Sequence, residues 1–272
     1  MLYKTIKYEK KEGVALITLN RPHALNALSR ELSRELNEAL EEAEGDEEVR
    51  VLIITGAPRS DGRPCFSAGA DIKEVADKGL AGLGLKESTI ADEVEAIAKI
   101  SAQLPFQNIY EMRKPVIAAI DGICTAGGLG LAEACDIRLV AETAEISDMH
   151  IKNLGFIGGG GATAFLPRIV GASMAKEMVF TGEPIDGKEA WRIGFANHVY
   201  PPDKLMQAAM YMAKRIATMN PSGIRMAKAL INASPDMDMR QALIYSRLCS
   251  AAYSPKQGFE NFTKRSEERE SE

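Results

Sequence analysis

The sequence contains few of the residues from which metal centres and disulfide frameworks are built. Its 272 residues include only four cysteines and three histidines. The cysteines are scattered and form no C-x-x-C pair, and the histidines lie far apart, so we expect no metal site and no disulfide framework. Reduced thiols of this kind favour a cytoplasmic protein.

An excess of positive charge and a long apolar run are also missing. The formal net charge is −5, which provides no general field for nucleic acid or for an anionic membrane surface. No apolar run approaches the roughly 20 residues that a membrane helix needs. The first residues, "MLYKTIKYEKKEG", lack the apolar core of a signal peptide. We therefore predict neither a nucleic-acid partner nor a membrane partner.

The nucleotide-binding motifs are absent as well, although two loops carry glycine. No G-K-[ST] follows the glycines, and the G-x-G-x-x-G fingerprint is not found in its required setting. The loops are "CFSAGADIKE" at residues 65–74 and "DGICTAGGLGLAEACD" at residues 121–136. Two separated backbone N–H donors suit a carbonyl oxygen that gains charge better than a pyrophosphate. The residues alone equally allow two tight turns that only pack a helix against a strand.

Strand and helix patterns alternate through most of the chain and predict an α/β fold with a largely parallel sheet. Ser29 is positioned to cap a helix that has an apolar stripe. From about residue 204 the chain is helical in character, and no linker precedes it. We predict one functional unit with a core at residues 1–203 and a helical region at 204–272. The expected strands are residues 13–20, 49–56, 115–122 and 136–142.

An ordered set of segments resembles the enoyl-CoA hydratase/isomerase (crotonase) superfamily. The set begins at "GVALITLNRPHALNAL" and includes both glycine loops, "GFIGGGGATAFLPRIVG" and "TGEPIDGKEAWRIGFANHV". It ends at "GFENFTKRSEE" and so covers nearly the whole chain. The resemblance implies a crotonase-like spiral of β-β-α repeats with a C-terminal helical trimerisation region. It also implies an acyl-CoA thioester substrate and a homotrimer or a dimer of trimers.

The resemblance also assigns residues to the site. The two oxyanion-hole N–H groups of the family fall on Ala70 and Gly127. The family's C-terminal segment, which helps to cover coenzyme A, falls around Lys256 and Phe262. Its adenine and pantetheine contacts fall on Arg21, Ala24, Ala68, Asp71 and Ile72.

The chain departs from the family where family hydratases carry two catalytic glutamates. The first glutamate lies three residues after the second oxyanion glycine, a position occupied here by Gly130. Ungapped counting places Ile151 at the second position. The usual arrangement of two carboxylates acting on one water therefore cannot be assumed.

Asp148 and His150 flank the second position and are our candidates for proton transfer. Alternatively, His150 is a surface or structural histidine, and Asp148 bonds its local backbone, as aspartate in a turn often does. We expect Glu133 to be too remote or engaged with structure. Cys124 and Asp136 are expected to be a buried small side chain and a structural residue.

The default reaction implied by the resemblance is hydration of a 2-enoyl-CoA through a thioester enolate. Isomerisation, decarboxylation and hydrolysis use the same kind of oxyanion hole and remain alternatives. A non-catalytic coenzyme A-binding or oligomeric scaffold is a further alternative. No separate cofactor is predicted, because coenzyme A is part of the substrate.

Overall fold

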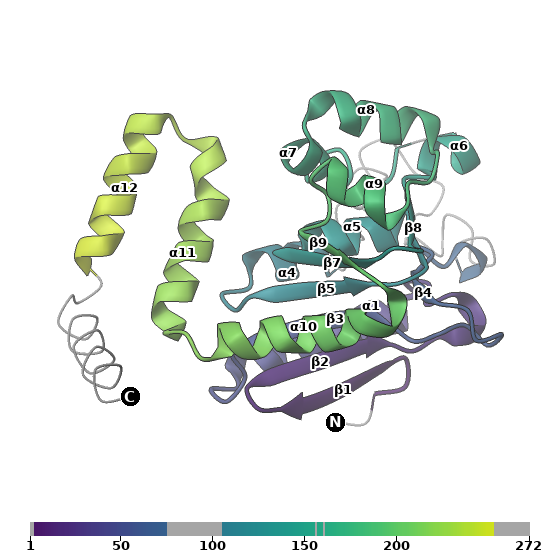
Figure 1. Ribbon diagram of the computed structural model, residues 1–272, viewed down its shortest axis with the longest axis horizontal. Coiled ribbons are helices and arrows are strands. Elements are labelled where there is room, and N and C mark those ends of the chain that lie inside the picture. Colours follow the sequence, from purple (N-terminus) through teal and green to yellow (C-terminus); the bar gives the residue numbers. More distant parts are fainter. Residues whose placement is uncertain (1–2, 75–104, 156, 160, 253–272) are drawn as a thin grey trace, which may run out of the picture. The chain divides into compact units, whose positions relative to one another are not determined.

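Two sheets of parallel and antiparallel strands organise the first part of the chain. The computed structural model describes residues 3–74, 105–155, 157–159 and 161–252. The larger sheet has the order β1-β2-β3-β5-β7-β9, in which β1 and β2 are antiparallel and the other pairs are parallel (Figure 1). Its strands are β1 (Ile6–Lys11), β2 (Val14–Leu19), β3 (Val51–Gly56), β5 (Val116–Ile120), β7 (Ile137–Ala141) and β9 (His198–Tyr200).

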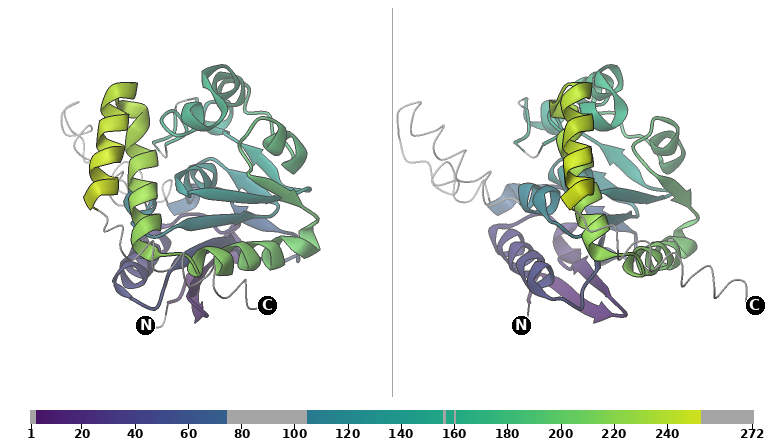
Figure 2. Two further views of the ribbon diagram at one scale, coloured as in Figure 1. Left: turned by 60° about the vertical axis from the view of Figure 1, so that its left-hand side comes forward. Right: turned by 90° about the vertical axis from the view of Figure 1, so that its left-hand side faces the viewer.

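Alternate residues of the larger sheet belong to two separate apolar clusters, because successive side chains point to opposite faces. On β3, Leu52 and Ile54 join one cluster, whereas Val51 and Ile53 join the other. Helix α10 (Pro202–Ala217) covers the second face through Leu205, Ala209 and Ala213 (Figure 2). Burial of both faces explains why these strands read as continuous apolar runs in the sequence.

The smaller sheet has the order β4-β6-β8, and all of its strands are parallel. Its strands are β4 (Cys65–Ser67), β6 (Ile123–Thr125) and β8 (Glu145–Ser147). Along the chain, β3, β5 and β7 of the larger sheet are each followed by one of these short strands. This repeated passage from one sheet to the other, with helices between the turns, is the predicted crotonase-like spiral of β-β-α units.

Helices complete the first compact unit, which spans Met1–Thr218. Helix α1 begins after Ser29, whose side chain accepts a hydrogen bond from the N–H of Leu32, so the predicted cap is confirmed. The helices other than α10 are η1 (Pro22–Ala24), α1 (Arg30–Gly45), α4 (Phe106–Glu111), α5 (Gly127–Ala134), α6 (His150–Leu154), α7 (Leu166–Val170), α8 (Ala172–Thr181) and α9 (Gly187–Arg192).

The second compact unit, Met219–Glu272, is helical where the structure describes it. It contains α11 (Pro221–Ala233), η2 (Ser234–Asp236) and α12 (Met239–Ala252). Several apolar side chains of this unit are exposed in the single chain, including Ile231, Met239 and Leu248, at 68%, 75% and 63%. Among the described residues, no helix has both the length and the apolar character needed to cross a membrane.

The four strands expected from apolar runs are present as β2, β3, β5 and β7. The turn-rich segment at residues 57–75 predicts little regular structure, but it includes the short strand β4. The strands of the smaller sheet were not predicted, because three residues are too few to produce a periodic pattern.

Candidate functional site

The three strands of the smaller sheet end at the predicted site. Because the strands are parallel, their carboxyl ends lie along one edge of the sheet, although the pairing of β4 with β6 shifts register between Cys65 and Ser67. The chain leaves β4 toward Ala70, leaves β6 toward Gly127 and leaves β8 toward Asp148 and His150. The topology thus brings three segments that are far apart in the sequence to one edge of the smaller sheet.

The backbone at Ala70 is held by a parallel bridge to Leu28. The N–H of Leu28 donates to the oxygen of Gly69 at 2.7 Å, and the N–H of Asp71 donates to the oxygen of Leu28 at 3.2 Å. Leu28 thus bonds to the residues before and after Ala70. In such a parallel bridge, the middle residue directs its own N–H to the opposite side. The N–H of Ala70 therefore points away from Leu28.

Gly127 lies beside Ala70. A β-carbon added at Gly127 would stand 3.4 Å from the nitrogen of Ala70, which places the two backbones in contact. Gly127 is the first residue of α5, so its N–H has no partner within the helix. The preceding residue, Ala126, has φ 52° and ψ −120°, a strained conformation for a residue with a side chain. The strained turn aims the start of α5 toward Ala70.

Two buried side chains fix the loops around Ala70. The amide of Asn26 donates to the oxygens of Ala57 and Cys65, at 2.8 and 2.9 Å. The hydroxyl of Ser67 donates to the oxygen of Asn26 at 2.9 Å and accepts from the N–H of Gly69 at 3.2 Å. These bonds join the end of β4 to the segment after β2. Sequence reasoning did not identify either residue.

Asp148 and His150 form a pair. The Nδ1 atom of His150 lies 2.6 Å from Oδ1 of Asp148, and the backbone N–H of His150 donates to the same oxygen at 2.9 Å. The Asp148 side chain is 3% exposed and that of His150 is 12% exposed. Burial opposes ionisation of Asp148, but the hydrogen bonds from His150 outweigh it and hold its pKa below the ordinary value.

The imidazole of His150 lies against the glycine-rich loop that follows α6. A β-carbon at Gly158 would fall 2.2 Å from Cε1 and 2.3 Å from Nε2 of this ring. Any other residue at position 158 would therefore collide with the imidazole. Within the described residues, the glycine at this position allows the loop to approach the His150 ring closely.

We expected Glu133 to be too remote or engaged with structure, and the structure bears on the second of these alternatives. Glu133 is 3% exposed, and neither of its carboxyl oxygens has a hydrogen-bond partner among the residues that the structure describes. The expected structural partner is therefore not found there. Burial, followed by the charge of Asp148, raises the pKa of Glu133 to about 8, against a smaller opposing effect of Arg138. The distance in sequence between Glu133 and Asp148 concealed this relationship.

The other residues near the first glycine loop are placed as follows. Arg21 Nη2 lies 2.8 Å from Asp71 Oδ2, with side-chain exposures of 16% and 13%. The pKa of Asp71 is lowered, because the bond to Arg21 and backbone donors outweigh the larger single effect of burial. Ala24 and Ala68 are half-buried, and Ile72 is 56% exposed. Lys256 and Phe262 lie outside the described residues.

The two residues expected to be structural are engaged within the fold. The Cys124 side chain is fully buried with Sγ 3.6 Å from the oxygen of Gly128, and burial raises its pKa. A carboxyl oxygen of Asp136 accepts from the N–H of Val116 at 2.8 Å. Gly130 lies within α5, and Ile151 lies in the first turn of α6 and packs against the core.

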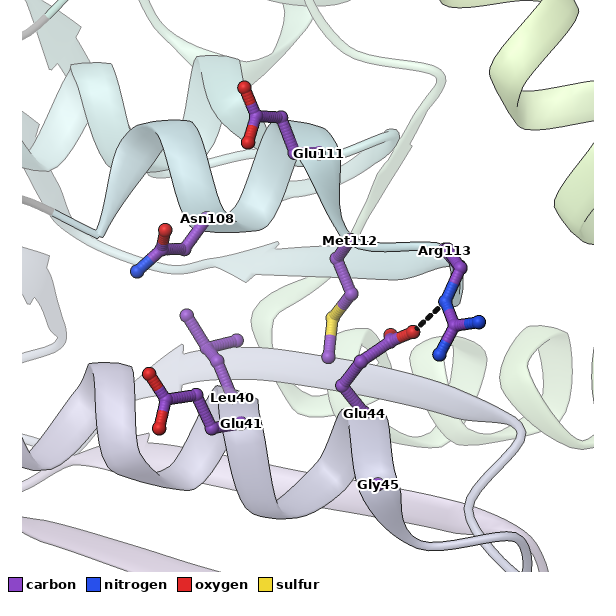
Figure 3. A pocket seen from close by; sticks show the side chains of 8 residues that line it. All are labelled: Leu40, Glu41, Glu44, Gly45, Asn108, Glu111, Met112 and Arg113. Atoms are coloured by element: carbon purple, nitrogen blue, oxygen red, sulfur yellow. Dashed lines mark hydrogen bonds and ion pairs between the residues drawn. The ribbon is translucent and has the colours of Figure 1, made fainter.

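A surface pocket of about 560 Å³ lies between α1 and α4 (Figure 3). Its lining includes none of the predicted site residues: it consists of Leu40, Glu41, Glu44, Gly45, Asn108, Glu111, Met112 and Arg113. Within the described part of the chain, no group of three or more His, Cys, Asp or Glu side chains is arranged to hold a metal ion.

Comparisons of the sequence and of the structure with known proteins identify the same family. A family model described as enoyl-CoA hydratase/isomerase matches residues 9–267. A crotonyl-CoA hydratase of Syntrophomonas wolfei is 34% identical over 266 residues, which cover 96% of each chain. A short-chain-enoyl-CoA hydratase of Clostridium acetobutylicum is 35% identical over 237 residues, covering 87% of this chain and 84% of that one. The crystal structure of an enoyl-CoA hydratase from Bacillus anthracis superimposes with a TM-score of 0.83 at 31% identity, covering 96% and 97% of the two chains.

Proposed function

Because this chain belongs to the enoyl-CoA hydratase/isomerase family, we propose that it hydrates a 2-enoyl-CoA through a thioester enolate. The family places the protein among acyl-CoA-processing enzymes. The single observation that supports the proposal is the adjacency of Ala70 and Gly127 at the edge that also carries Asp148 and His150. A thioester oxygen between the two backbone N–H groups would be stabilised as it becomes negative, by roughly 3–4 kcal/mol per donor.

His150 is the proposed base. The carboxylate of Asp148 accepts a hydrogen bond from Nδ1–H of His150. This bond favours the tautomer of His150 with its proton on Nδ1, so the lone pair lies on Nε2. Fixing the tautomer and stabilising the imidazolium is what a buried aspartate does for histidine in other enzymes. The pair replaces the two glutamates that are missing at Gly130 and Ile151.

The proposed reaction uses one base. Nε2 of His150 takes a proton from water while the water oxygen bonds to C3 of the substrate. The electrons of the C2=C3 double bond move to C2–C1, and the thioester oxygen carries the resulting charge between Ala70 and Gly127. The enolate then collapses, and C2 takes the proton from the imidazolium. Atoms and charge balance, and no separate cofactor is proposed, because coenzyme A arrives with the substrate.

Binding of the coenzyme A part is proposed for the first glycine loop. Arg21, Ala24, Ala68, Asp71 and Ile72 surround the segment that carries Ala70, and the family resemblance adds Lys256 and Phe262. In the described chain, Arg21 and Asp71 are paired with one another. Their proposed role is therefore to hold the loop, with coenzyme A contacting its backbone.

A homotrimer or a dimer of trimers is the proposed assembly. The exposed apolar side chains of α11 and α12 support it, because large exposed apolar surfaces usually mark an interface. We also propose a cytoplasmic location. All four cysteines are free, with Cys65, Cys124 and Cys135 buried, as suits a reducing compartment.

Crotonyl-CoA turnover by wild type, Asp148→Asn and His150→Ala tests the reaction and the base together. Asp148→Asn keeps the shape but removes the charge that favours the imidazolium, so we expect kcat to fall by about 10²–10⁴ in both variants. Equal rates in all three proteins would exclude the pair as the base. Binding of crotonyl-CoA without turnover by wild type would favour the alternatives: isomerase, decarboxylase, hydrolase or non-catalytic scaffold.

A further inference from the structure

Glu133 is a buried acid that the reaction above does not use. It lies on α5, the helix whose first residue is Gly127, and it is 3% exposed. Neither carboxyl oxygen has a hydrogen-bond partner among the described residues. Buried polar groups are nearly always paired, and an ionised carboxylate left unpaired in the interior is especially costly. The carboxyl therefore needs either a proton or a partner.

Asp148 and Glu133 differ in the number of hydrogen-bond donors that reach them. Asp148 accepts two hydrogen bonds from His150, and Glu133 accepts none from the described residues. The two carboxyls are close enough for the charge of Asp148 to affect Glu133. Ionising both would place a second negative charge in a buried region, so the proton stays on the group that lacks donors. That group is Glu133. Its pKa is raised to about 8, which is consistent with a protonated carboxyl at neutral pH.

The other charged and titratable groups around α5 do not change this assignment. Arg138 is the positive group that acts on Glu133, but its guanidinium donates to the oxygens of Phe195 and Cys135. Among the described elements, those that pack most extensively against α5 are β4, β6 and α4. Titratable or charged side chains on these elements are Cys65, Cys124, Tyr110 and Glu111.

The position of Glu133 on α5 connects it to the oxyanion donors. Side chains on a helix lean toward its N-terminus and lie over the preceding turn. For Glu133 the residue one turn earlier on the same face is Gly130, which has no side chain. The Cα–Cβ bond of Glu133 is thus directed toward the end of α5 that carries Gly127. The partial positive charge at this end favours an anion, and a negative Glu133 would oppose it.

We propose that Glu133 is a positioning residue that must hold its proton while the enolate forms, an inference that rests on the proposed function. The neutral carboxyl is buried without adding a second negative charge near Asp148 and the enolate oxygen. Loss of the proton places that charge behind the oxyanion donors and slows enolate formation. Activity therefore falls when Glu133 ionises.

Infrared spectroscopy of the full-length protein tests the protonation state without substrate. We expect wild type at neutral pH to show the carbonyl band of a protonated carboxylic acid in an apolar site, and Glu133→Gln to lack it. The band should disappear as the pH is raised through about 8. A wild-type spectrum without this band, or a Glu133→Gln spectrum that keeps it, would overturn the inference.

The pH dependence of turnover tests the role in the reaction. Glutamine has the shape of the neutral acid and cannot ionise. We compare the ratio of kcat at about pH 9 to kcat at about pH 7, and expect it to be about tenfold higher in Glu133→Gln than in wild type. Glu111→Gln, which alters an exposed carboxyl on α4, should keep the wild-type ratio. The same ratio in Glu133→Gln and wild type would overturn the role of Glu133, whereas turnover by wild type itself tests the proposed function.

Discussion

Gly69 lies so close to Gly127 that a β-carbon at Gly69 would stand 2.7 Å from the backbone nitrogen of Gly127. The same β-carbon would lie 2.8 Å from Cβ of Ala126. Gly69 also has φ +94°, a conformation that side chains rarely adopt. Two loops that are far apart in sequence can approach one another here only because position 69 has no side chain.

Gly69→Ala should therefore separate the two proposed oxyanion donors. We expect kcat/KM to fall by about 10²–10³, as when one such donor is lost. Steady-state kinetics and thermal unfolding measure the effects on activity and on stability. Gly45→Ala is the matched control, since no atom lies within 4 Å of its added β-carbon and α1 favours alanine. Wild-type kinetics in Gly69→Ala would contradict the proposed hole.

Gly158→Ala should displace the imidazole of His150, because the new β-carbon would overlap the ring. We expect the hydrogen bond to Asp148 to be lost and kcat to fall by about 10²-fold or more, the usual contribution of a positioned base. The imidazole proton signals in NMR spectra report the bond, and kinetics reports the base. A variant that loses the bond but keeps full activity would show that His150 is structural.

Glu133→Gln should change how stability depends on pH. The pKa of Glu133 is raised from 4.5 to about 8 on folding, so the unfolded chain releases this proton first as the pH rises. The free energy of unfolding of wild type should then decrease relative to the variant by up to about 1.4 kcal/mol per pH unit between these two values. Urea unfolding at several pH values measures the difference. A constant difference across this range would contradict a protonated Glu133.

Arg21 and Asp71 should be energetically coupled, because their charged atoms lie 2.8 Å apart and are largely buried. We expect Arg21→Ala and Asp71→Ala each to lower the free energy of unfolding by about 3 kcal/mol, since each leaves a charge without its partner. The double variant should lose clearly less than the sum of the two losses. Additive losses would show that the pair does not hold the loop at Ala70.

Much of the larger sheet could be predicted from the sequence. Val51–Gly56 and Val116–Ile120 are apolar at nearly every position, because both faces of their sheet are covered. Ser29 marked the start of α1 through the chemistry of its side chain. The family could be recognised from the order of its motifs along the chain. The resemblance then assigned the candidate positions Ala70 and Gly127.

Only the tertiary structure decided how the site residues are related. The strands of the smaller sheet are three residues long, so no periodicity could show that their ends meet at one edge. The sequence placed Asp148 and His150 two residues apart, but only backbone geometry determined that their side chains pair. The sequence predicts a remote or structural role for Glu133. Its burial and its lack of hydrogen-bond donors among the described residues depend on the folded chain and cannot be inferred from the sequence. The sequence by itself determined the family and pointed to Ala70 and Gly127 as candidate backbone donors, whereas only the folded chain showed which side chains pair and which are buried without a partner among the described residues, because that depends on contacts between distant residues.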